Sequence, residues 1–531
     1  MKYKVLVSDS LAKEGVEIFK QNPNIEVDVK TGLKPEELKA IIGNYHGLAV
    51  RSATNVTADV IEVAKNLKVV GRAGIGVDHV DVPAASAKGI VVMNTPGGNT
   101  TTTAEHTIAM MMSLARWIPQ ATATTKAGKW EKKKFMGSEL FNKTLGVVGL
   151  GNIGAIVADR ARGLKMRVLA FDPFVTPEKA QAMGVELATL DEIWTKSDFI
   201  TVHTPLTDKT RGVVNKAAFD KMKKGVRIIN CARGGIVDEK DLYDAIKSGK
   251  VAGAALDVFV EEPVPAGHPL LTLDEVIVSP HLGASTDEAQ VNVSIAVAEQ
   301  MVEYLTTGGI RNAVNVPSVS PDALPALRPY LSLAERMGSF VAQLAQGNVK
   351  KLTIEYSGEV VSLGVSPITV AMLKGFFEPI VQGVNYVSAP VIAKERGIEV
   401  SEVKNTKSED FASTLSVRVM SDKGETHLVG ALFGRSDTRI VRINEFLVEC
   451  TPQNTILLIE NKDVPGVIGN IGTALAKAGI NIIQMFVGRR TDTKGDALST
   501  VVVGQPLDEK HLKELQSLPN LLSVRQVVLQ K

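Results

Sequence analysis

The sequence is poor in several features that define large classes of protein. Of its 531 residues only two are cysteines, Cys231 and Cys450, and there is no CxxC pair. This scarcity excludes a disulfide framework, predicts no metal site and indicates a reducing compartment. Long apolar runs are missing too, because no stretch reaches the ~18 residues of a membrane helix. Residues 1–10 lack the apolar region of a signal peptide, so we expect a cytoplasmic protein with no membrane partner.

An excess of charge of one sign is also absent. The chain has 60 lysines and arginines against 58 acidic residues, which gives a formal net charge of +2. Proteins that bind nucleic acids carry a basic stripe or domain, and no long basic block occurs here, so we expect no nucleic-acid partner. What is present is the composition of an ordinary globular protein, 44% hydrophobic and 5% aromatic. The length indicates about three or four domains.

The order of the apolar runs predicts the fold class. Strand-like runs alternate with helical stretches over residues 4–96 and again over residues 145–279, which predicts two doubly wound α/β domains with parallel sheets. Prolines at every fourth position from Pro317 to Pro329 predict a linker, since proline breaks helices and lacks a strand donor. An α+β domain follows, and the last segment, from residue 453, has the βαββαβ order of a ferredoxin-like unit.

The strongest local motif is a glycine-rich turn between a predicted strand and a predicted helix. Such a turn lets the backbone approach a pyrophosphate, and the helix N-terminus supplies amides and a positive dipole end. Asp172 ends the next strand, eighteen residues after the last glycine, and suits the ribose hydroxyls of a dinucleotide. A carboxylate there would repel a 2′-phosphate, so the sequence predicts NAD rather than NADP. The residues of the turn are Gly149, Gly151, Asn152, Ile153 and Gly154.

Candidate catalytic groups follow other strands of the second α/β series. Ligands of doubly wound folds bind at the carboxyl ends of the strands, and both His203 and His281 stand there, so the spacing leaves two candidates for proton transfer. His106 falls within a predicted helix. Arg233 follows a strand and can grip a carboxylate with two parallel hydrogen bonds. Glu262 lies in a loop, where acids are usually solvated.

Four segments together resemble the D-isomer-specific 2-hydroxyacid dehydrogenase family: residues 149–154, 230–235, 257–263 and 279–285. The chain is most similar to the members that oxidise 3-phospho-D-glycerate, as residues 50–54, 71–78 and 129–137 indicate, and the similarity covers essentially the whole chain. It implies a discontinuous substrate-binding domain (1–98 and 285–316), an NAD-binding Rossmann domain (99–284), an intervening domain (317–452) and an ACT domain (453–531).

The resemblance also assigns roles to individual residues. His281 would take the hydroxyl proton, Glu262 would stabilise the protonated imidazole, and Arg233 would bind the substrate carboxylate. His203 then becomes a residue that lines the site. The residues placed at the cofactor are Gly149, Gly151, Asn152, Ile153, Gly154, Asp172, Thr204, Cys231, Ala232, Arg233, Asp257, His281, Gly283 and Ala284.

Substrate and effector sites are implied in the same way. Arg51, Arg72 and Gly74 would join Arg233 at the substrate, and Lys132 either reaches it from a neighbouring subunit or lies on a solvated face. In the ACT domain, a module that binds amino acids, Asp463 and Asn481 would recognise L-serine as a feedback inhibitor. The alternative for that domain is a purely oligomerising role. The family resemblance favours a homotetramer.

The predicted function is therefore NAD-dependent oxidation of 3-phospho-D-glycerate to 3-phosphohydroxypyruvate, the first step of phosphorylated L-serine biosynthesis. A second reading is a dehydrogenase for another 2-hydroxyacid, such as 2-hydroxyglutarate. A third is a non-catalytic NAD-sensing protein, because fold and even site can be reused for binding alone.

Overall fold

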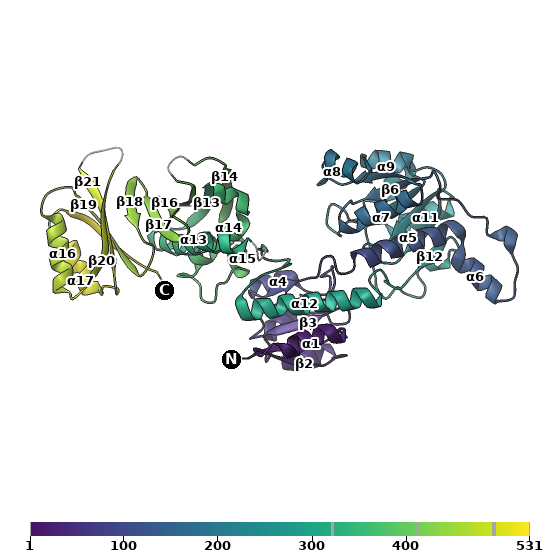
Figure 1. Ribbon diagram of the computed structural model, residues 1–531, viewed down its shortest axis with the longest axis horizontal. Coiled ribbons are helices and arrows are strands. Elements are labelled where there is room, and N and C mark those ends of the chain that lie inside the picture. Colours follow the sequence, from purple (N-terminus) through teal and green to yellow (C-terminus); the bar gives the residue numbers. More distant parts are fainter. Residues whose placement is uncertain (1, 320–322, 409–410, 491–494, 530–531) are drawn as a thin grey trace.

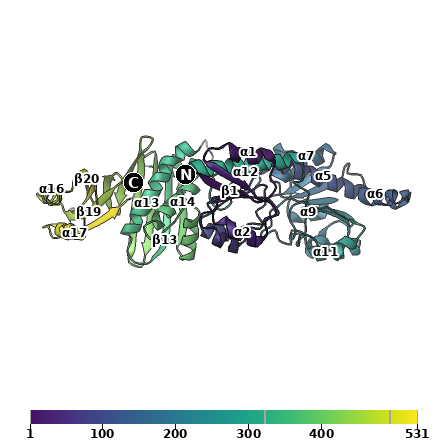
Figure 2. The same ribbon diagram turned by 90° about the horizontal axis from the view of Figure 1, so that it is seen from below.

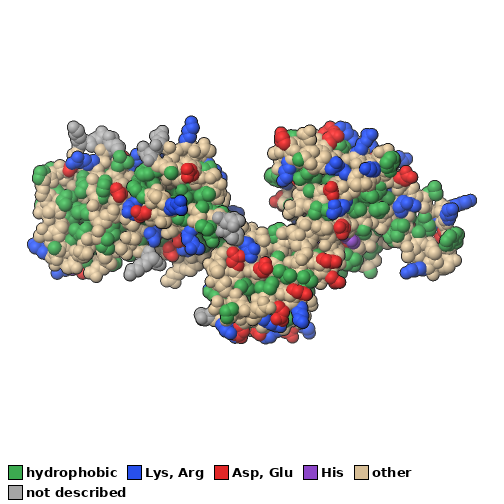
Figure 3. Space-filling model, in the orientation of Figure 1, with side chains coloured by type: hydrophobic (Ala, Val, Ile, Leu, Met, Phe, Trp, Pro, Cys, Tyr) green, Lys and Arg blue, Asp and Glu red, His purple; other side chains and the backbone are tan. Residues whose placement is uncertain are grey.

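The computed structural model describes residues 2–319, 323–408, 411–490 and 495–529. Its strands form four sheets, of five, seven, six and four strands, and each sheet belongs to a separate lobe in an extended row (Figures 1 and 2). On the face shown in Figure 3, basic and acidic side chains are interspersed over all the lobes. Within these described ranges, no helix has the length and apolar character that a membrane crossing requires.

The first lobe is a parallel sheet with the strand order β2-β1-β3-β4-β5. The long helix α12 (Asp287–Thr307) returns from the second lobe and buries Val293, Val297 and Met301 against this sheet. The strands are β1 (Tyr3–Val7), β2 (Ile25–Val29), β3 (Gly47–Val50), β4 (Val69–Arg72) and β5 (Val91–Met93). The other helices are α1 (Lys13–Gln21), α2 (Pro35–Ile42), α3 (Ala58–Val63) and α4 (Val82–Ala87).

The second lobe is also parallel, with the order β12-β11-β10-β9-β6-β7-β8. Because the chain turns back between β6 and β9, the carboxyl ends of these two strands form the crevice in which doubly wound folds bind ligands. The strands are β6 (Thr144–Val148), β7 (Arg167–Phe171), β8 (Glu186–Leu187), β9 (Phe199–Val202), β10 (Val226–Asn230), β11 (Val251–Leu256) and β12 (Val276–Val278). The helices are α5 (Thr100–Arg116), α6 (Ile118–Lys126), α7 (Asn152–Gly163), α8 (Pro177–Ala182), α9 (Leu190–Lys196), α10 (Lys216–Lys221) and α11 (Glu239–Lys247), with 3₁₀ turns η1 (Lys132–Lys134) and η2 (Pro269–Thr272).

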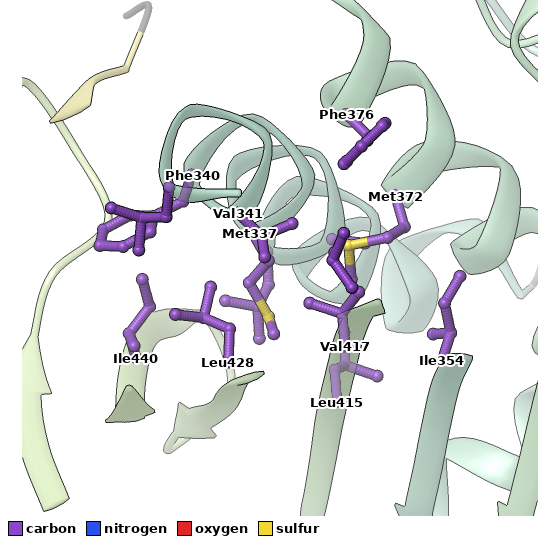
Figure 4. Close-up of a cluster of buried hydrophobic side chains, with 14 of the residues drawn as sticks. Met337, Phe340, Val341, Ile354, Met372, Phe376, Leu415, Val417, Leu428 and Ile440 are labelled. Atoms are coloured by element: carbon purple, nitrogen blue, oxygen red, sulfur yellow. The ribbon is translucent and has the colours of Figure 1, made fainter. Parts of the chain in front are cut away.

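The third lobe corrects the linker prediction. Helix α13 (Leu324–Leu344) begins inside the proline-rich segment and contains Pro329, while Pro321 lies outside the described residues. Pro325 stands in the first turn, where no amide donor is needed, and Pro329 removes one helical hydrogen bond. The loss is offset because Met337 and Phe340 are fully buried over the sheet (Figure 4).

The remaining elements of the third lobe surround the same core, in which side chains of α13 and α14 face those of the sheet (Figure 4). The strand order is β14-β13-β15-β16-β17-β18. The strands are β13 (Val349–Gly358), β14 (Glu399–Asn405), β15 (Ser413–Ser421), β16 (Gly424–Phe433), β17 (Asp437–Ile443) and β18 (Phe446–Cys450). The helices are α14 (Ser366–Phe377), α15 (Ser388–Glu395) and the 3₁₀ turn η3 (Glu359–Leu363).

The fourth lobe confirms the predicted βαββαβ order. Its antiparallel sheet has the order β20-β21-β19-β22, with both helices packed on one core. The elements are β19 (Thr455–Lys462), α16 (Val467–Lys477), β20 (Ile482–Arg489), β21 (Asp496–Val503), α17 (Glu509–Gln516) and β22 (Leu521–Val528).

Neighbouring lobes are joined by specific contacts. The amide Nδ2 of Asn385, before α15, donates to the carbonyl of Gly89 in the first lobe at 2.9 Å. At the other side of the third lobe, Phe446 of β18 forms a bridge with Arg490, which follows β20. The strands approach so closely that a Cβ on Gly488 would lie 2.2 Å from the carbonyl oxygen of Leu447. The fold class predicted from the sequence is therefore confirmed, with two parallel α/β lobes, an α+β lobe and a ferredoxin-like lobe.

Candidate active site

The turn between β6 and α7 has the shape that a pyrophosphate requires. Gly149 has φ of 96°, which favours glycine. A Cβ on Gly154 would lie 2.0 Å from the carbonyl oxygen of Gly149, so only glycine allows the helix to pack against the turn. No atom lies within 4 Å of the position that a Cβ on Gly151 would take, so the loop is open there. Asn152 and Ile153 begin α7, and the first amides of a helix have no partner within it and can bind an anion.

The residues around the turn also fit a dinucleotide. Asp172 follows β7 directly, and its carboxylate accepts from the amides of Leu150 and Phe174, each at 2.8 Å, which fixes the acid beside the glycine turn. The hydroxyl of Thr204, after β9, is buried and has no hydrogen-bond partner. A buried polar atom of this kind is costly unless a ligand satisfies it. The donor set therefore suits a ribose-containing cofactor.

Arg233 is projected into the cleft by a turn after β10. The Nδ2 of Asn230 donates to the carbonyl of Arg233 at 2.9 Å, and its Oδ1 accepts from the amide of Ala232 at 3.0 Å. Cys231 lies inside this turn, and burial, with a smaller effect of the Asp257 charge, raises the pKa of its thiol to about 12. The thiol therefore stays protonated at neutral pH, and Cys231 contributes backbone and packing rather than nucleophilic chemistry.

His281 and Glu262 form a hydrogen-bonded pair. Nδ1 of His281 donates to Oε2 of Glu262 at 2.7 Å, and the amide of Phe259 donates to Oε1 at 3.0 Å. Burial alone would raise the pKa of the Glu262 carboxyl, but these two hydrogen bonds and the nearby imidazole outweigh it and hold the pKa below its usual value. The carboxylate is thus ionised at neutral pH and accepts the hydrogen bond from Nδ1 of His281. The other ring nitrogen, Nε2, is therefore the one that can exchange a proton.

His203 differs from His281 in its surroundings. It is partly buried, its enclosed Nδ1 has no partner, and its Nε2 lies 3.0 Å from the Thr201 hydroxyl. Burial lowers the pKa of His203 to about 4, so the imidazole is neutral at physiological pH. Of the two histidines that the spacing left open, His281 is the one with a carboxylate partner.

Asp257 organises the loop that carries His281. Its Oδ1 accepts from the Ser279 hydroxyl at 2.6 Å and from the Leu282 amide at 2.7 Å, and its Oδ2 accepts from the Gly283 amide at 2.8 Å. These bonds stabilise a backbone in which His281 has φ of 55°. Burial would raise the pKa of Asp257, but the hydrogen bonds to it hold that pKa below its usual value. Ala284, the residue after Gly283 in this loop, is half-buried.

Sequence reasoning missed His106 as a partner in this loop. Nε2 of His106 lies 3.2 Å from Oδ1 of Asp257 and 3.1 Å from the hydroxyl of Ser279. Helical periodicity was the signal that could have found it. His106 is one turn from Thr103 and so lies on the same face of the helix, and the Thr103 hydroxyl donates to the carbonyl of Gly283 in this loop at 2.9 Å.

Three cations converge from the two lobes. Arg72 ends β4, and its guanidinium covers Gly74, whose φ is 145° and whose Cβ would lie 1.4 Å from Nη1 of Arg72. Burial, followed by the charge of Arg233, lowers the pKa of Arg72 to about 10, so it stays protonated at neutral pH. Arg51 follows β3, and its amide donates to the buried Asp9 carboxylate at 2.6 Å. The positive charges of Arg51, Arg72 and Arg233 therefore lie close to one another where the two lobes meet.

Three other predicted residues are not brought to this cleft. Lys132 lies on η1, in the exposed arm beyond α6 (Figure 1). Asp463 and Asn481 stand in the fourth lobe, at opposite ends of its sheet. β21 pairs Asp496 with Lys462 at one end and Val503 with Ile482 at the other, a span of about 23 Å at the rise of a strand. One ligand cannot touch both residues within one chain.

Comparison with family models accounts for most of the chain. Residues 108–283 match the D-isomer specific 2-hydroxyacid dehydrogenase NAD binding domain. Residues 326–444 match the D-3-phosphoglycerate dehydrogenase intervening domain, and residues 455–520 match the ACT domain. The second lobe is therefore an NAD-binding domain, in agreement with the cofactor predicted from Asp172.

Known proteins extend the match to full length. A D-3-phosphoglycerate dehydrogenase of Archaeoglobus fulgidus is 46% identical over 99% of this chain and 100% of its own, and one of Bacillus subtilis is 42% identical over 98% and 99%. Among solved structures, the D-lactate dehydrogenase of Aquifex aeolicus, complexed with NAD and lactic acid, is 27% identical, with a TM-score of 0.52 over 59% of this chain and 100% of its own. The chain belongs to the D-isomer-specific 2-hydroxyacid dehydrogenase family, among the D-3-phosphoglycerate dehydrogenases that carry an intervening domain and an ACT domain.

Proposed function

We propose that this protein oxidises 3-phospho-D-glycerate to 3-phosphohydroxypyruvate with NAD, the first step of phosphorylated L-serine biosynthesis. The observation that carries the proposal is the His281–Glu262 pair, 2.7 Å apart, in a cleft that also presents Arg233 and Arg72. The substrate has a hydroxyl, a carboxylate and a phosphate. The cleft offers a base for the first and separate cations for the other two.

Each residue has a distinct task in this reaction. Glu262 holds Nδ1 of His281, so that Nε2 takes the hydroxyl proton and the resulting imidazolium is stabilised by the carboxylate. Arg233 binds the substrate carboxylate and polarises the forming carbonyl. Arg51 and Arg72 bind the phosphate. The bound NAD supplies the hydride acceptor.

The test is NADH formation, followed by absorbance, with a panel of 2-hydroxyacids. We expect the highest kcat/KM with 3-phospho-D-glycerate and far lower values with D-lactate and 2-hydroxyglutarate. A preference for 2-hydroxyglutarate would replace the substrate by that alternative. No NADH with any hydroxyacid, together with tight NAD binding, would favour a sensing protein.

Regulation by L-serine is part of the proposal, with a site that two ACT domains build together. Asp463 of one copy and Asn481 of another can meet, although within one chain they stand at opposite ends of the sheet. Asp463 is paired with Arg489, whose Nε lies 2.8 Å from Oδ2, so an effector's ammonium has to compete with this guanidinium.

Assembly into a homotetramer in the cytoplasm completes the proposal. The arm after α6 exposes Trp130 at 86% and Met136 at 78% of their surfaces, which is unusual for large apolar side chains of a monomer. A second copy that covers the arm would bring Lys132 near a neighbouring cleft. Sedimentation of the wild-type protein beside a Trp130→Ser variant tests this, since a tetramer that persists in the variant would argue against the arm as an interface.

A further inference from the structure

Asp78 faces Arg233 across the cleft between the first two lobes. Nε of Arg233 lies 3.1 Å from Oδ2 of Asp78, although the residues are 155 positions apart. Asp78 stands in the loop after β4, and Arg233 in the turn after β10. Among the residues that the structure describes, this is the one ion pair that joins these two lobes.

The pair determines which edge of the guanidinium is available. Nε is used by Asp78, and Nη1 donates to the carbonyl of Ala232 at 2.6 Å. What remains is the end-on edge, at which Nη1 and Nη2 each offer an N–H. A carboxylate binds an arginine best through two parallel hydrogen bonds, and this edge provides them. Asp78 and Ala232 together thus select one of the two bidentate edges of Arg233.

Gly76 makes room for this arrangement. A Cβ on Gly76 would lie 1.9 Å from Nη2 of Arg233 and 2.6 Å from Oδ2 of Asp78. Any larger residue would displace both side chains. The loop after β4 therefore accommodates the catalytic arginine of the other lobe as well as its own Asp78.

Stability of the fold does not explain the pair. Asp78 is 64% and Arg233 28% exposed, and ion pairs so open to solvent contribute little to folding. Its electrostatic effect is local. The charge of Arg233 lowers the pKa of the nearby Arg72, and that of Asp78 raises it, so Asp78 offsets the repulsion between the two guanidiniums.

We propose that Asp78 is a positioning residue that reaches across the cleft to hold Arg233 with its end-on edge toward the substrate carboxylate. Arg233 touches the substrate and Asp78 acts only through it. This inference rests on the proposed role of Arg233. It also makes the grip on the carboxylate dependent on closure of the two lobes, because the lobe that binds the phosphate supplies the residue that orients the arginine.

The test compares Asp78→Ala, Asp78→Asn and a control, Glu62→Ala, an exposed acid on α3 of the same lobe. We expect Asp78→Ala to raise the KM for 3-phospho-D-glycerate by about tenfold or more, the effect of losing one charged hydrogen bond at a site. Asp78→Asn keeps an oxygen that accepts from Nε, so it should recover most of the loss. The KM for NAD and the melting temperature should stay at the wild-type values in all three variants.

Three results would overturn the inference: a wild-type KM in Asp78→Ala, an Asp78→Asn variant as impaired as Asp78→Ala, or a parallel loss of NAD affinity and thermal stability. The last would show a merely structural role. Failure of the proposed substrate is separate, because the wild-type protein itself would then be inactive with 3-phospho-D-glycerate. The three variants are in that case compared on the hydroxyacid that the wild type oxidises.

Discussion

The catalytic cleft and the ACT domain present their functional residues in opposite ways. In the cleft, functional side chains meet within one chain: His281 meets Glu262, 19 positions away, and Arg233 meets Asp78, 155 positions away. In the ACT domain, Asp463 and Asn481 are only 18 residues apart in sequence, yet they stand at opposite ends of one sheet. The difference indicates that the groups proposed for hydride transfer lie together in one chain, whereas an effector site made of Asp463 and Asn481 would require two chains.

The strongest test of the self-contained cleft is His281→Asn. The variant keeps a polar group of similar size but removes the base, so we expect turnover to fall by ~10²–10⁴ while NAD still binds. Steady-state kinetics and NAD titration by fluorescence measure the two effects. His203→Asn serves as the matched comparison: the His203 imidazole is neutral and has no carboxylate partner, so its loss should reduce turnover far less. Near-normal turnover in His281→Asn would remove His281 from the mechanism.

The nucleotide side of the cleft is tested next by Asp172→Ser. Loss of the carboxylate removes charged hydrogen bonds to the ribose, so the KM for NAD should rise by about 10- to 100-fold. The KM for NADP should change less or fall, because the repulsion of a 2′-phosphate is lost. The ratio of the two efficiencies is the measurement, with the melting temperature as a control, since Asp172 also binds the Leu150 amide. An unchanged ratio would contradict a role of Asp172 in cofactor choice.

The two-chain site is tested by mixing subunits. Asp463→Ala and Asn481→Ala should each lose inhibition by L-serine. Mixed assemblies, co-expressed with two affinity tags, should regain part of it, because one of the two sites at each paired interface then has both residues. Lys510→Ala, an exposed change on α17, controls for damage to the domain. Mixed assemblies as insensitive as either variant would place the site within one chain.

The last prediction concerns folding and compares the two halves through their partly buried histidines. Burial lowers the pKa of His203 and of His427 to about 4 in the folded chain. The unfolded chain binds these protons already near pH 6.5, so stability is complete above that pH and falls as the pH drops from about 6.5 toward 4. At ~1.4 kcal/mol per pKa unit, His203 contributes roughly 3 kcal/mol to this loss.

Urea unfolding at a series of pH values measures the effect. His203→Asn should flatten the pH dependence of the transition that involves the NAD-binding domain and leave the contribution of His427, in β16, in place. An unchanged slope in His203→Asn would mean that His203 is not a source of the acid sensitivity.

Much of the fold was predictable because local patterns and tertiary packing agree in it. The alternation of apolar runs with helical stretches predicted both parallel sheets, and the βαββαβ order is read directly from the last segment. Pro329 shows where the local rule fails. It lies inside α13, because the apolar face of that helix, which includes Met337 and Phe340, is completely buried, and the burial outweighs one missing hydrogen bond.

The site was predictable in its motifs and not in its supporting contacts. The glycine turn and Asp172 carry their chemistry in a short stretch of sequence. His106 and Asp78 do not, because their partners Asp257 and Arg233 are 151 and 155 positions away. Whether Asp78 meets Arg233 depends on how two lobes close, which no local pattern encodes.

The contact between β18 and β20 joins the intervening domain directly to the ACT domain, so the lobes of the extended row are connected without a break. β20 begins beside Asn481, the candidate effector residue. Near its other end, β20 lies in close backbone contact with β18 of the intervening domain. The intervening domain in turn contacts the first lobe, because Asn385 donates a hydrogen bond to the carbonyl of Gly89, just before β5. The contacts between the lobes therefore form an unbroken chain from β20 of the ACT domain to the sheet of the first lobe, in which Arg72 ends β4 and Arg51 follows β3.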